Sequence, residues 1–332
     1  MNPIKKIKEY IHNKPNIKKI IGITFIILGF LAFITPLTPG SWLFIIGLEL
    51  LGLRIIFSTK IANLKSSMDV KVVKKFTNYL LRAFAVLFLI YFGLGVILFF
   101  FQNNYIYYPD KTDMKECQSF NNADKISHNS SRGYYTERSA DKIIVYYHGN
   151  AGRACDRYFL DQFFAEQNYS TYFVEYSGYA ELKDNPSMEK ILNNVLDTIE
   201  FVKTKTFTSV TIIGESIGVG PAAYHAQQSN IDNLVLITAF NNFSNLASSH
   251  YPIYPINMFL RDNYTPDKWL EDYTGPISII LAENDEFIPQ KLSLKLFDGI
   301  RSNLKEIFTV KNVGHNTIYE SNDFYTYLKI AL

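Results

Sequence analysis

The ten residues "TIIGESIGVG", 211 to 220, place three glycines around one serine, Ser216, directly after an apolar run. Residues Gly214 to Gly218 have the spacing Gly-x-Ser-x-Gly, in which small neighbours relieve crowding at a sharp strand-to-helix turn. The preceding "SVTII" is typical of a strand and the following "VGPAAYHAQQ" of a helix. A phosphate-binding loop would need a lysine after its second glycine, and none is present. The stretch therefore predicts a nucleophilic serine raised on a tight turn.

From about residue 133 onward, short apolar runs alternate with helical patterns. Six runs rich in β-branched or aromatic residues are expected to be strands: "KIIVYYH" (142–148), "STYFVEY" (170–176), "SVTIIG" (209–214), "NLVLIT" (233–238), "ISIILA" (277–282) and "EIFTV" (306–310). Between the second and third runs, seven apolar residues fall on one helical face: Met188, Ile191, Leu192, Val195, Leu196, Ile199 and Val202. This alternation predicts an α/β fold with a mostly parallel sheet flanked by helices.

A serine hydroxyl needs a base to accept its proton, and six histidines are candidates. In an open α/β sheet, reactive groups gather in the loops at the carboxyl ends of the strands. His315, in "NVGHN" (312–316) after the last expected strand, lies in such a loop and is the predicted base. The other five are less suitable because of where they fall: His12 across the membrane, His128 ahead of the sheet, His148 ahead of the glycine in "HGNAG", His225 in a helix and His250 in an aromatic segment.

The acid that orients this base is expected in "AENDEFIP" (282–289), which follows the fifth expected strand. The loop offers Glu283, Asp285 and Glu286, and periodicity does not separate them. All three can also be read as solvated loop carboxylates. The order serine, acid, histidine along the chain is the one expected for an α/β-hydrolase.

Residues 102–332 resemble the α/β-hydrolase fold, and within it the membrane-associated α/β-hydrolase-domain serine hydrolases, which include lysophospholipid lipases and protein depalmitoylases. The stretches that carry this resemblance are "FQNNYIYYP" (101–109), "VYYHGNAG" (145–152), "EYSGYA" (175–180), "GESIGVG" (214–220), "AENDEFIP" and "GHN" (314–316). The resemblance implies Ser216 as nucleophile, Asp285 as orienting acid and His315 as base. Two departures from the family pattern, Glu175–Ala180 in place of Asp-Tyr-Arg-Gly-Tyr-Gly and Val219 in place of a common glycine, bear on substrate contacts more than on chemistry.

An acyl-transfer site also needs backbone N–H groups aimed at the developing oxyanion. Ile217, the residue after the nucleophile, is expected to supply one of them. The second is expected from "HGNAG" (148–152), from Asn150 or alternatively from Ala151. No cofactor or metal is expected, and Cys117 and Cys155 have neither metal-site spacing nor a Cys-x-x-Cys arrangement. These two cysteines are expected to be unpaired or loosely buried.

The excess of apolar residues lies at the front of the chain, in residues 20–57 and 83–101. The run 20–35 would span only about 24 Å as a helix, and Pro36, Pro39 and Gly40 end it before a second run, 41–57. We therefore expect a helical hairpin over 20–57, and the stretch "TPLTPGSWLFIIGLELLGLR" (35–54) resembles a family of predicted membrane proteins with a Pro-Gly-Pro-Gly-Trp turn. The run 83–101 is about 28 Å long as a helix and suffices to cross a bilayer alone.

Lysines and arginines cluster before this hairpin and in the basic loop expected over 58–82, which favours a cytoplasmic location for both. The expected organisation is a multi-pass membrane region, 1–101, with about three transmembrane helices. An α/β-hydrolase domain, 102–332, then lies on the outer (periplasmic or extracellular) face of a bacterial inner membrane. A cleaved signal peptide is the competing interpretation of the N-terminus. The net charge of +2, without a basic stripe in the globular part, does not favour nucleic acid as a partner.

The 35 residues 241–275 between the fourth and fifth expected strands are long for a connection and are expected to form a small cap. Its apolar residues either line an acyl pocket, touch the bilayer or form an ordinary packed helix-turn: Tyr251, Ile253, Tyr254, Ile256, Met258, Phe259 and Leu260. The function expected is a membrane-anchored serine hydrolase that cleaves small-molecule or lipid-like acyl esters or thioesters. An acyltransferase with the same triad, or a catalytically silent membrane scaffold, is the alternative, and the oligomeric state is left open.

Overall fold

A computed structural model describes residues 70–180 and 185–332 of the chain. The hairpin expected over 20–57, His12 and residues 58–69 of the expected basic loop lie outside these described residues. Residues Phe99–Leu332 form a compact unit separate from the residues before them. This unit carries all of the residues expected to form the functional site.

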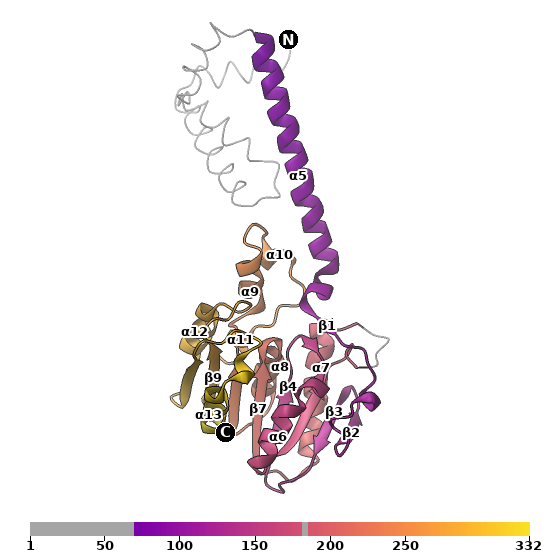
Figure 1. Cartoon of the computed structure of the whole chain (residues 1–332), viewed down its shortest axis with the longest axis vertical. Helices are drawn as coiled ribbons and strands as arrows, with labels where there is room; N and C mark the ends of the chain where they lie inside the picture. The colour runs from indigo at the N-terminus through magenta and orange to yellow at the C-terminus, as the bar shows by residue number, and fades with distance from the viewer. Residues whose placement is uncertain (1–69, 181–184) are drawn as a thin grey trace, which may run out of the picture. The chain divides into compact units, whose positions relative to one another are not determined.

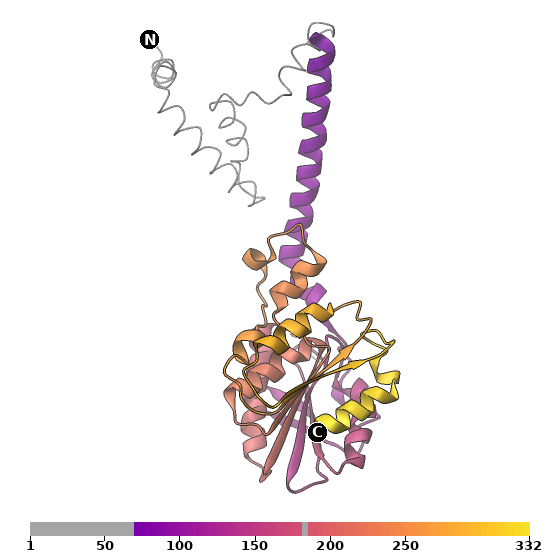
Figure 2. The same cartoon turned by 90° about the vertical axis from the view of Figure 1, so that its left-hand side faces the viewer.

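A twisted sheet of eight strands runs through this unit (Figures 1 and 2). In spatial order the strands are β10 (Lys305–Val310), β9 (Ile277–Ala282), β8 (Asn233–Ile237), β7 (Ser209–Glu215), β4 (Lys142–Tyr147), β6 (Ser170–Glu175), β3 (Ser131–Thr136) and β2 (Asp124–His128). The pairs from β10 to β6 are parallel, whereas β3 is antiparallel to both β6 and β2. The six strands predicted from sequence and the mostly parallel sheet are confirmed.

The hairpin of β2 and β3 was not expected from the sequence, and the placement of His128 ahead of the sheet is wrong. His128 is the last residue of β2 and pairs with Ser131 of β3. The two residues between them include Asn129, which has φ 52° and so favours a tight hairpin turn. Because β2 is an edge strand without a buried residue, it has almost no apolar alternation that a sequence pattern would reveal.

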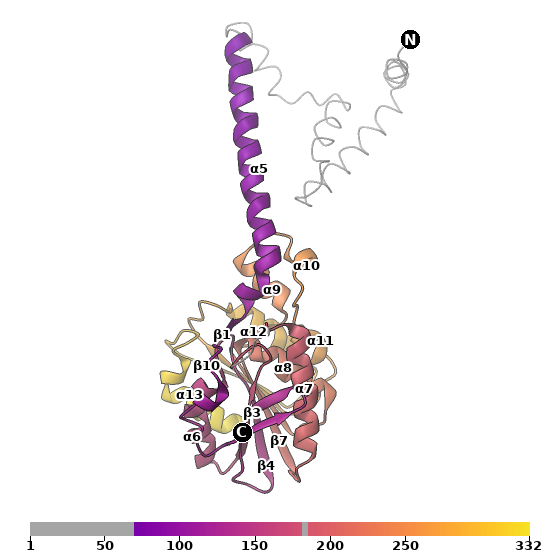
Figure 3. The same cartoon turned by 90° about the vertical axis from the view of Figure 1, so that its right-hand side faces the viewer.

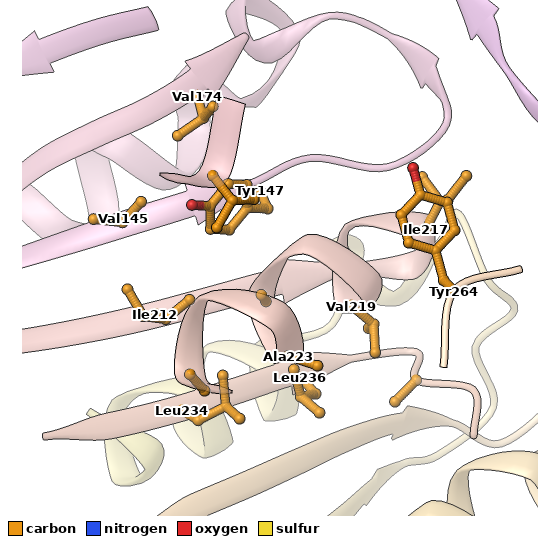
Figure 4. Close-up of a cluster of buried hydrophobic side chains, with 14 of the residues drawn as sticks. Val145, Tyr147, Val174, Ile212, Ile217, Val219, Ala223, Leu234, Leu236 and Tyr264 are labelled. Carbon is orange, nitrogen blue, oxygen red and sulfur yellow. The ribbon is translucent and has the colours of Figure 1, made fainter. Parts of the chain in front are cut away.

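Helices cover both faces of the sheet, and alternate residues of each strand enter two separate cores. Ile143, Val145 and Tyr147 of β4 belong to the first core, while Ile144 and Tyr146 belong to the second. Figure 4 shows part of the first core, where residues of β4, β6, β7 and β8 meet α8. Most helix residues buried in the first core come from α7 (Met188–Lys203), α8 (Val219–Gln228), α9 (Phe243–His250) and α12 (Gln290–Gly299), and Ile106 at the end of α5 (Val70–Ile106) adds to it. The second core is covered by α6 (Tyr158–Glu166) and α13 (Asn322–Ala331), with the short helices η2 (Ala154–Arg157) and η4 (Ile318–Glu320).

The amphipathic helix predicted from residue 186 onward is α7, which begins after Ser187, whose side chain accepts a hydrogen bond from the Lys190 N–H. Ile191, Val195, Ile199 and Val202 of the predicted apolar face are buried, and Met188 and Leu192 pack against the core. The prediction that Leu196 lies on the buried face is wrong, because Leu196 is exposed. It lies at the edge of the apolar stripe, where spacing alone does not decide burial.

One helix within the described residues is long and apolar enough to cross a membrane, on the grounds of its length and composition. This candidate span, Thr77–Ile106, has a mean hydropathy of 2.7 and belongs to α5 (Val70–Ile106). Thirty helical residues extend about 45 Å, more than a hydrocarbon core requires. Residues 70–82 were expected to belong to the basic loop, but they are helical. Charge alone does not end a helix, and this stretch contains no proline or glycine.

The segment between β8 and β9, expected to be a cap, contains α9, α10 (Ile256–Phe259) and α11 (Pro266–Trp269). Figure 3 shows α9 and α10 beside the last turns of α5, with α11 next to α8. Leu246 of α9 and Leu260 after α10 contact the first core, while α10 has no buried residue. The segment is thus partly packed and partly exposed.

The expectation for the cysteines is wrong, because Cys117 and Cys155 form a disulfide with their Cα atoms 5.9 Å apart. Cys117 follows the short helix η1 (Met114–Glu116), and Cys155 lies in η2. Both short helices contribute residues to the second core, which brings together two thiols that are 38 residues apart in sequence. No local spacing rule reports such a pairing.

Candidate active site

Ser216 lies at the carboxyl end of β7, where the strand turns directly into the short helix η3 (Ser216–Gly218) and then into α8. Its φ of 53° is rare for a residue with a side chain and is the strained geometry of a nucleophile elbow. A Cβ at Gly218 would collide with the carbonyl oxygen of Tyr147, and a Cβ at Gly214 would collide with Ala222. The two glycines are therefore required by close packing around the turn and not by their own backbone angles.

His315 lies in the loop after β10, with its Nε2 atom 3.0 Å from the Ser216 Oγ atom. Its Nδ1 atom is 2.8 Å from the Oδ2 atom of Asp285, in the loop after β9. The side chains of His315 and Asp285 are almost buried. The structure thus brings Ser216, His315 and Asp285 together at the carboxyl ends of three strands, as the strand-end rule predicts.

The three carboxylates of the loop after β9, which periodicity did not separate, have three different partners. Asp285 binds the His315 imidazole through one oxygen, and its other oxygen accepts the N–H groups of Phe287 and Ile288 at 2.9 and 2.7 Å. Glu286 accepts the backbone N–H of His315 at 3.0 Å. Glu283 accepts the backbone N–H of Asn312 and pairs with Lys311. One loop therefore orients the histidine and also holds the backbone that carries it.

The "HGNAG" loop lies beside the elbow, because Gly218 packs against the carbonyl oxygens of Tyr147 and His148. The Asn150 carbonyl accepts hydrogen bonds from the backbone N–H of Tyr108 at 3.2 Å and from the Tyr179 hydroxyl at 2.7 Å. The N–H of Ala151 points the opposite way from this carbonyl, since a trans peptide places the two groups on opposite sides. Ile217 is buried in the turn itself.

The loop that departs from the family pattern, Glu175–Ala180, contacts the "HGNAG" loop. The Tyr176 hydroxyl donates to the His148 carbonyl at 2.7 Å, and the Tyr176 ring stacks on the His148 ring with 4.1 Å between centroids. Together with the hydroxyl of Tyr179 on Asn150, these contacts hold two backbone carbonyls of the neighbouring loop. Tyr176 and Tyr179, which make these contacts, match the family pattern, whereas the departures fall on Glu175, Ser177 and Ala180.

A buried ion pair beneath the elbow was not found by sequence reasoning. The Arg157 guanidinium binds both carboxylate oxygens of Glu215, the residue before the serine, at 2.6 and 2.7 Å. The Tyr146 hydroxyl donates to the same carboxylate at 2.6 Å. Burial alone would raise the pKa of Glu215, but the charge and hydrogen bonds of Arg157 and the bond from Tyr146 hold this pKa at about 2. The only sequence signal for this ion pair is the glutamate inside Gly-x-Ser-x-Gly, because its partner Arg157 lies 58 residues away in the chain.

Three other histidines of the described residues have different surroundings. His225 is buried in α8 with its Nδ1 atom 2.7 Å from the Tyr147 hydroxyl, and burial lowers its pKa to about 3. His148 is buried 3.4 Å from Glu175. His250, at the end of α9, lies 2.8 Å from the carbonyl oxygen of Phe287 through its Nε2 atom. Of the residues 70–180 and 185–332, no three His, Cys, Asp or Glu side chains are grouped to hold a metal ion.

Comparison with solved structures identifies the fold. An esterase of Pyrococcus furiosus superimposes with a TM-score of 0.54 at 12% identity, covering 68% of this chain and 97% of the esterase. An α/β-hydrolase of Vibrio vulnificus gives 0.51 at 18% identity, covering 63% and 80% of the two chains. The chain therefore has the α/β-hydrolase fold.

Curated relatives share less than a third of their residues with this chain, and no protein-family model matches it. The protein YfhR of Salmonella typhi is 26% identical over 186 residues, which are 51% of this chain and 63% of that protein. YfhR of Escherichia coli K12 is 23% identical over 69% of this chain and 84% of its own length. The lysophosphatidylserine lipase ABHD12 of Danio rerio is 26% identical over 182 residues, 48% of each chain. The chain thus spans less than two thirds of the Salmonella protein and about half of the lipase.

Proposed function

We propose that this chain is a membrane-anchored serine hydrolase that cleaves carboxylic ester or thioester bonds of lipid-like acyl substrates. The observation that carries the proposal is the continuous chain of contacts from Ser216 Oγ to His315 Nε2 at 3.0 Å and from His315 Nδ1 to Asp285 at 2.8 Å. Such a chain activates a hydroxyl that is otherwise a weak nucleophile. The triad stands on a strained elbow, in the arrangement that acyl transfer requires.

In the proposed reaction, His315 Nε2 accepts the hydroxyl proton of Ser216 while the Oγ atom attacks the acyl carbonyl carbon. The tetrahedral intermediate collapses, the alcohol or thiol leaves with the proton from His315, and an acyl-serine ester remains. A water molecule then gives a proton to His315 and attacks this ester, which releases the acid and regenerates Ser216. Asp285 keeps the histidine proton on Nδ1, so that Nε2 is free to act as base.

The N–H of Ile217 and an N–H of the "HGNAG" loop, from Asn150 or Ala151, form the proposed oxyanion hole. The support for this assignment is the packing of that loop against the elbow and the three hydrogen bonds to the carbonyls of His148 and Asn150. Donors held in this way need no reorganisation when negative charge develops on the substrate oxygen.

The proposed location is a membrane crossed by α5 and by the upstream hairpin, with the domain 102–332 on the outer face of a bacterial inner membrane. Two observations support this location independently of each other. The apolar part of α5 is long enough to span a bilayer, with basic residues concentrated before it. The Cys117–Cys155 disulfide is of the kind that forms in oxidising compartments outside the cytoplasm.

The substrate class is inferred from the setting of the site. The relatives include a protein named as a lysophosphatidylserine lipase, and the structural neighbours include an esterase. The segment 241–275, proposed as a cap, exposes apolar side chains of a kind that an acyl chain or a bilayer would cover. A lipid-like acyl ester or thioester fits these observations. The proposed reaction uses no cofactor.

The test is hydrolysis by the full chain, in detergent or vesicles, of a panel of acyl esters and thioesters that differ in chain length. We expect the wild type to release the free acid, and Ser216→Ala to release none above background. Adding an alcohol and analysing the products separates hydrolysis from acyl transfer, because a transferase forms the new ester. A wild-type protein with no turnover of any panel member would instead favour a catalytically silent scaffold.

A further inference from the structure

The tip of the cap, residues 251–261, exposes several apolar side chains close together. Met258 has 69% of its surface exposed, and Tyr251 and Phe259 are also exposed. None of the four residues of α10 is buried. Contiguous exposed apolar residues of this size are typical of a surface that contacts another molecule or a membrane.

The cap tip is attached to the last turns of α5, which belong to the same compact unit. The Gln102 side chain donates to the Phe259 carbonyl at 3.3 Å and accepts the Arg261 backbone N–H at 2.8 Å. The rings of Phe99 and Phe259 meet edge to face with 6.1 Å between centroids. The Arg261 guanidinium lies over the Phe99 ring, 5.6 Å from its centroid. A buried amide, a ring pair and a cation therefore join the cap tip to α5. Figure 3 shows α10 beside the last turns of this helix.

The position of Phe99 and Gln102 along α5 sets the level of the cap tip relative to a bilayer. About 20 helical residues cross the hydrocarbon core, and the uninterrupted apolar run 83–101 supplies them. Gln102 is followed by Asn103 and Asn104, so the polar boundary falls here. Exposed aromatic residues surround the boundary, as in the aromatic belts of membrane proteins: Phe100, Phe101, Tyr105 and Tyr108.

We propose that the cap tip is a membrane-docking surface whose occupant is the outer leaflet of the bilayer that α5 crosses. Met258 and Phe259 enter the boundary between headgroups and acyl chains, and Arg261 stays at headgroup level. This inference rests on the proposed membrane anchoring by α5. It adds that the catalytic domain itself contacts the lipid surface and is not held away from that surface by α5.

The cap is connected to the triad through a chain of contacts that runs by way of α9 and Phe287. The α9 helix contacts α10 and ends at His250, whose Nε2 atom lies 2.8 Å from the Phe287 carbonyl. The Phe287 ring in turn lies edge-on to the His315 ring with 5.4 Å between centroids, and its N–H binds Asp285. The side of the domain that carries the triad loops is thus tied to the side that meets the leaflet.

The position of the cap tip is tested with a fluorophore that reports on lipid contact. The full chain carries Met258→Cys, is labelled without reductant with a nitrobenzoxadiazole dye, and is reconstituted into phosphatidylcholine vesicles containing nitroxide lipids. We expect a blue-shifted emission and strong quenching by a nitroxide placed near the glycerol end of the acyl chain. The matched control is Leu304→Cys, because Leu304 is also an exposed apolar residue, at 61%. It directly precedes the edge strand β10, whereas the cap follows the carboxyl end of β8.

A further label, at Val96→Cys within the apolar run 83–101, separates the two proposals. Quenching at Val96 and Met258 but not at Leu304 supports the docked cap. Quenching at Val96 alone, with Met258 as weakly quenched as Leu304, overturns the docking and leaves the anchoring intact. No quenching at Val96 overturns both.

The consequence for catalysis is tested by the substitution Met258→Asp, with Met258→Leu as the matched apolar control. Placing a carboxylate in the leaflet boundary is costly, so turnover of a long-chain acyl ester embedded in vesicles should fall about tenfold. Turnover of a soluble short-chain ester should stay within about twofold for both variants, since Met258 does not contact the triad. Equal losses on both substrates, or no loss on the vesicle substrate, would contradict the proposal.

Discussion

The Asp285 carboxylate and the His315 imidazole are in direct contact, with 2.8 Å between Oδ2 and Nδ1. The other oxygen of Asp285 is held by the N–H groups of Phe287 and Ile288, so the carboxylate has a single available orientation toward the histidine. Its neighbour Glu286 binds the backbone of the same histidine. Two adjacent acidic residues thus contact one histidine, one through its ring and one through its main chain.

The substitution Asp285→Asn should lower kcat by about 10³- to 10⁴-fold. The amide oxygen would take the place that accepts the Phe287 and Ile288 N–H groups, which turns the amide NH₂ toward His315. The histidine then carries its proton on Nε2, where it cannot accept the proton of Ser216. The control is Glu283→Gln, which should stay within about twofold, because Glu283 binds Asn312 and Lys311. Equal losses in the two variants, measured on one ester, would contradict the assignment of Asp285.

Glu286→Ala should lower kcat about threefold to tenfold and leave KM nearly unchanged. The Glu286 carboxylate accepts the His315 N–H, so its loss frees the backbone that positions the imidazole. Glu286→Gln keeps an acceptor oxygen and should recover most of the rate. A loss confined to KM, or no recovery in the glutamine variant, would show that Glu286 does not act through the position of His315.

The sequence predicted well those parts of the fold that depend on local pattern, and the predicted site residues lie close together in the structure. Each of the six parallel strands contains a run of β-branched or aromatic residues, and the elbow glycines lie close to Ser216 in the chain, so both could be recognised from short windows. The triad residues follow from the rule that strand ends converge at one edge of the sheet. Choosing Asp285 over its neighbours required the family resemblance, because which carboxylate faces His315 depends on the exact course of the loop.

Two of the features that the sequence did not reveal join distant segments. The Glu215–Arg157 pair and the Cys117–Cys155 disulfide each connect residues far apart in the chain, which no spacing rule detects. The β2 strand lacks apolar alternation because it lies at an exposed edge. Residues 70–82 were read as a loop because of their charges, although their composition permits the helix that the structure contains.

Glu215→Gln should destabilise the folded domain by about 3 kcal/mol at pH 7, because it leaves the Arg157 guanidinium without its buried counter-charge. The folded-state pKa of Glu215, about 2, lies below its ordinary value of 4.5. Its ionisation therefore contributes stability that is complete above about pH 4.5 and is lost as the pH falls toward 2. Denaturant unfolding of wild type and variant should give curves that converge over this range. A constant difference from pH 7 to 2 would contradict the role of the ion pair.

His225 should make the domain sensitive to acid at a higher pH than Glu215 does. Its folded-state pKa of about 3 lies below its ordinary value of 6.5, because the charged form is not tolerated in the buried site beside Tyr147. Stability from this group is therefore complete above pH 6.5 and declines as the pH falls toward 3. His225→Asn, which does not titrate, should flatten the dependence of the unfolding free energy on pH between 6.5 and 4.5. An unchanged slope in that interval would contradict this assignment.

The disulfide should contribute about 2 to 4 kcal/mol to the stability of the α/β-hydrolase domain, since it closes a loop of 38 residues. The double substitution Cys117→Ser with Cys155→Ser should lower Tm, and the wild type treated with reductant should show the same Tm as the double variant. The double variant itself should not respond to reductant. If reductant lowered the Tm of both proteins equally, the effect would have a cause other than this bond.

The central claim is that Ser216 is a nucleophile activated by His315. The most direct measurement is labelling of the full chain with a fluorophosphonate probe, followed by mass spectrometry of its peptides. The account predicts one phosphonylated residue, Ser216, in the wild type, no adduct in Ser216→Ala, and strongly slowed labelling in His315→Ala. An unlabelled wild type, or equal labelling of wild type and Ser216→Ala, would contradict it.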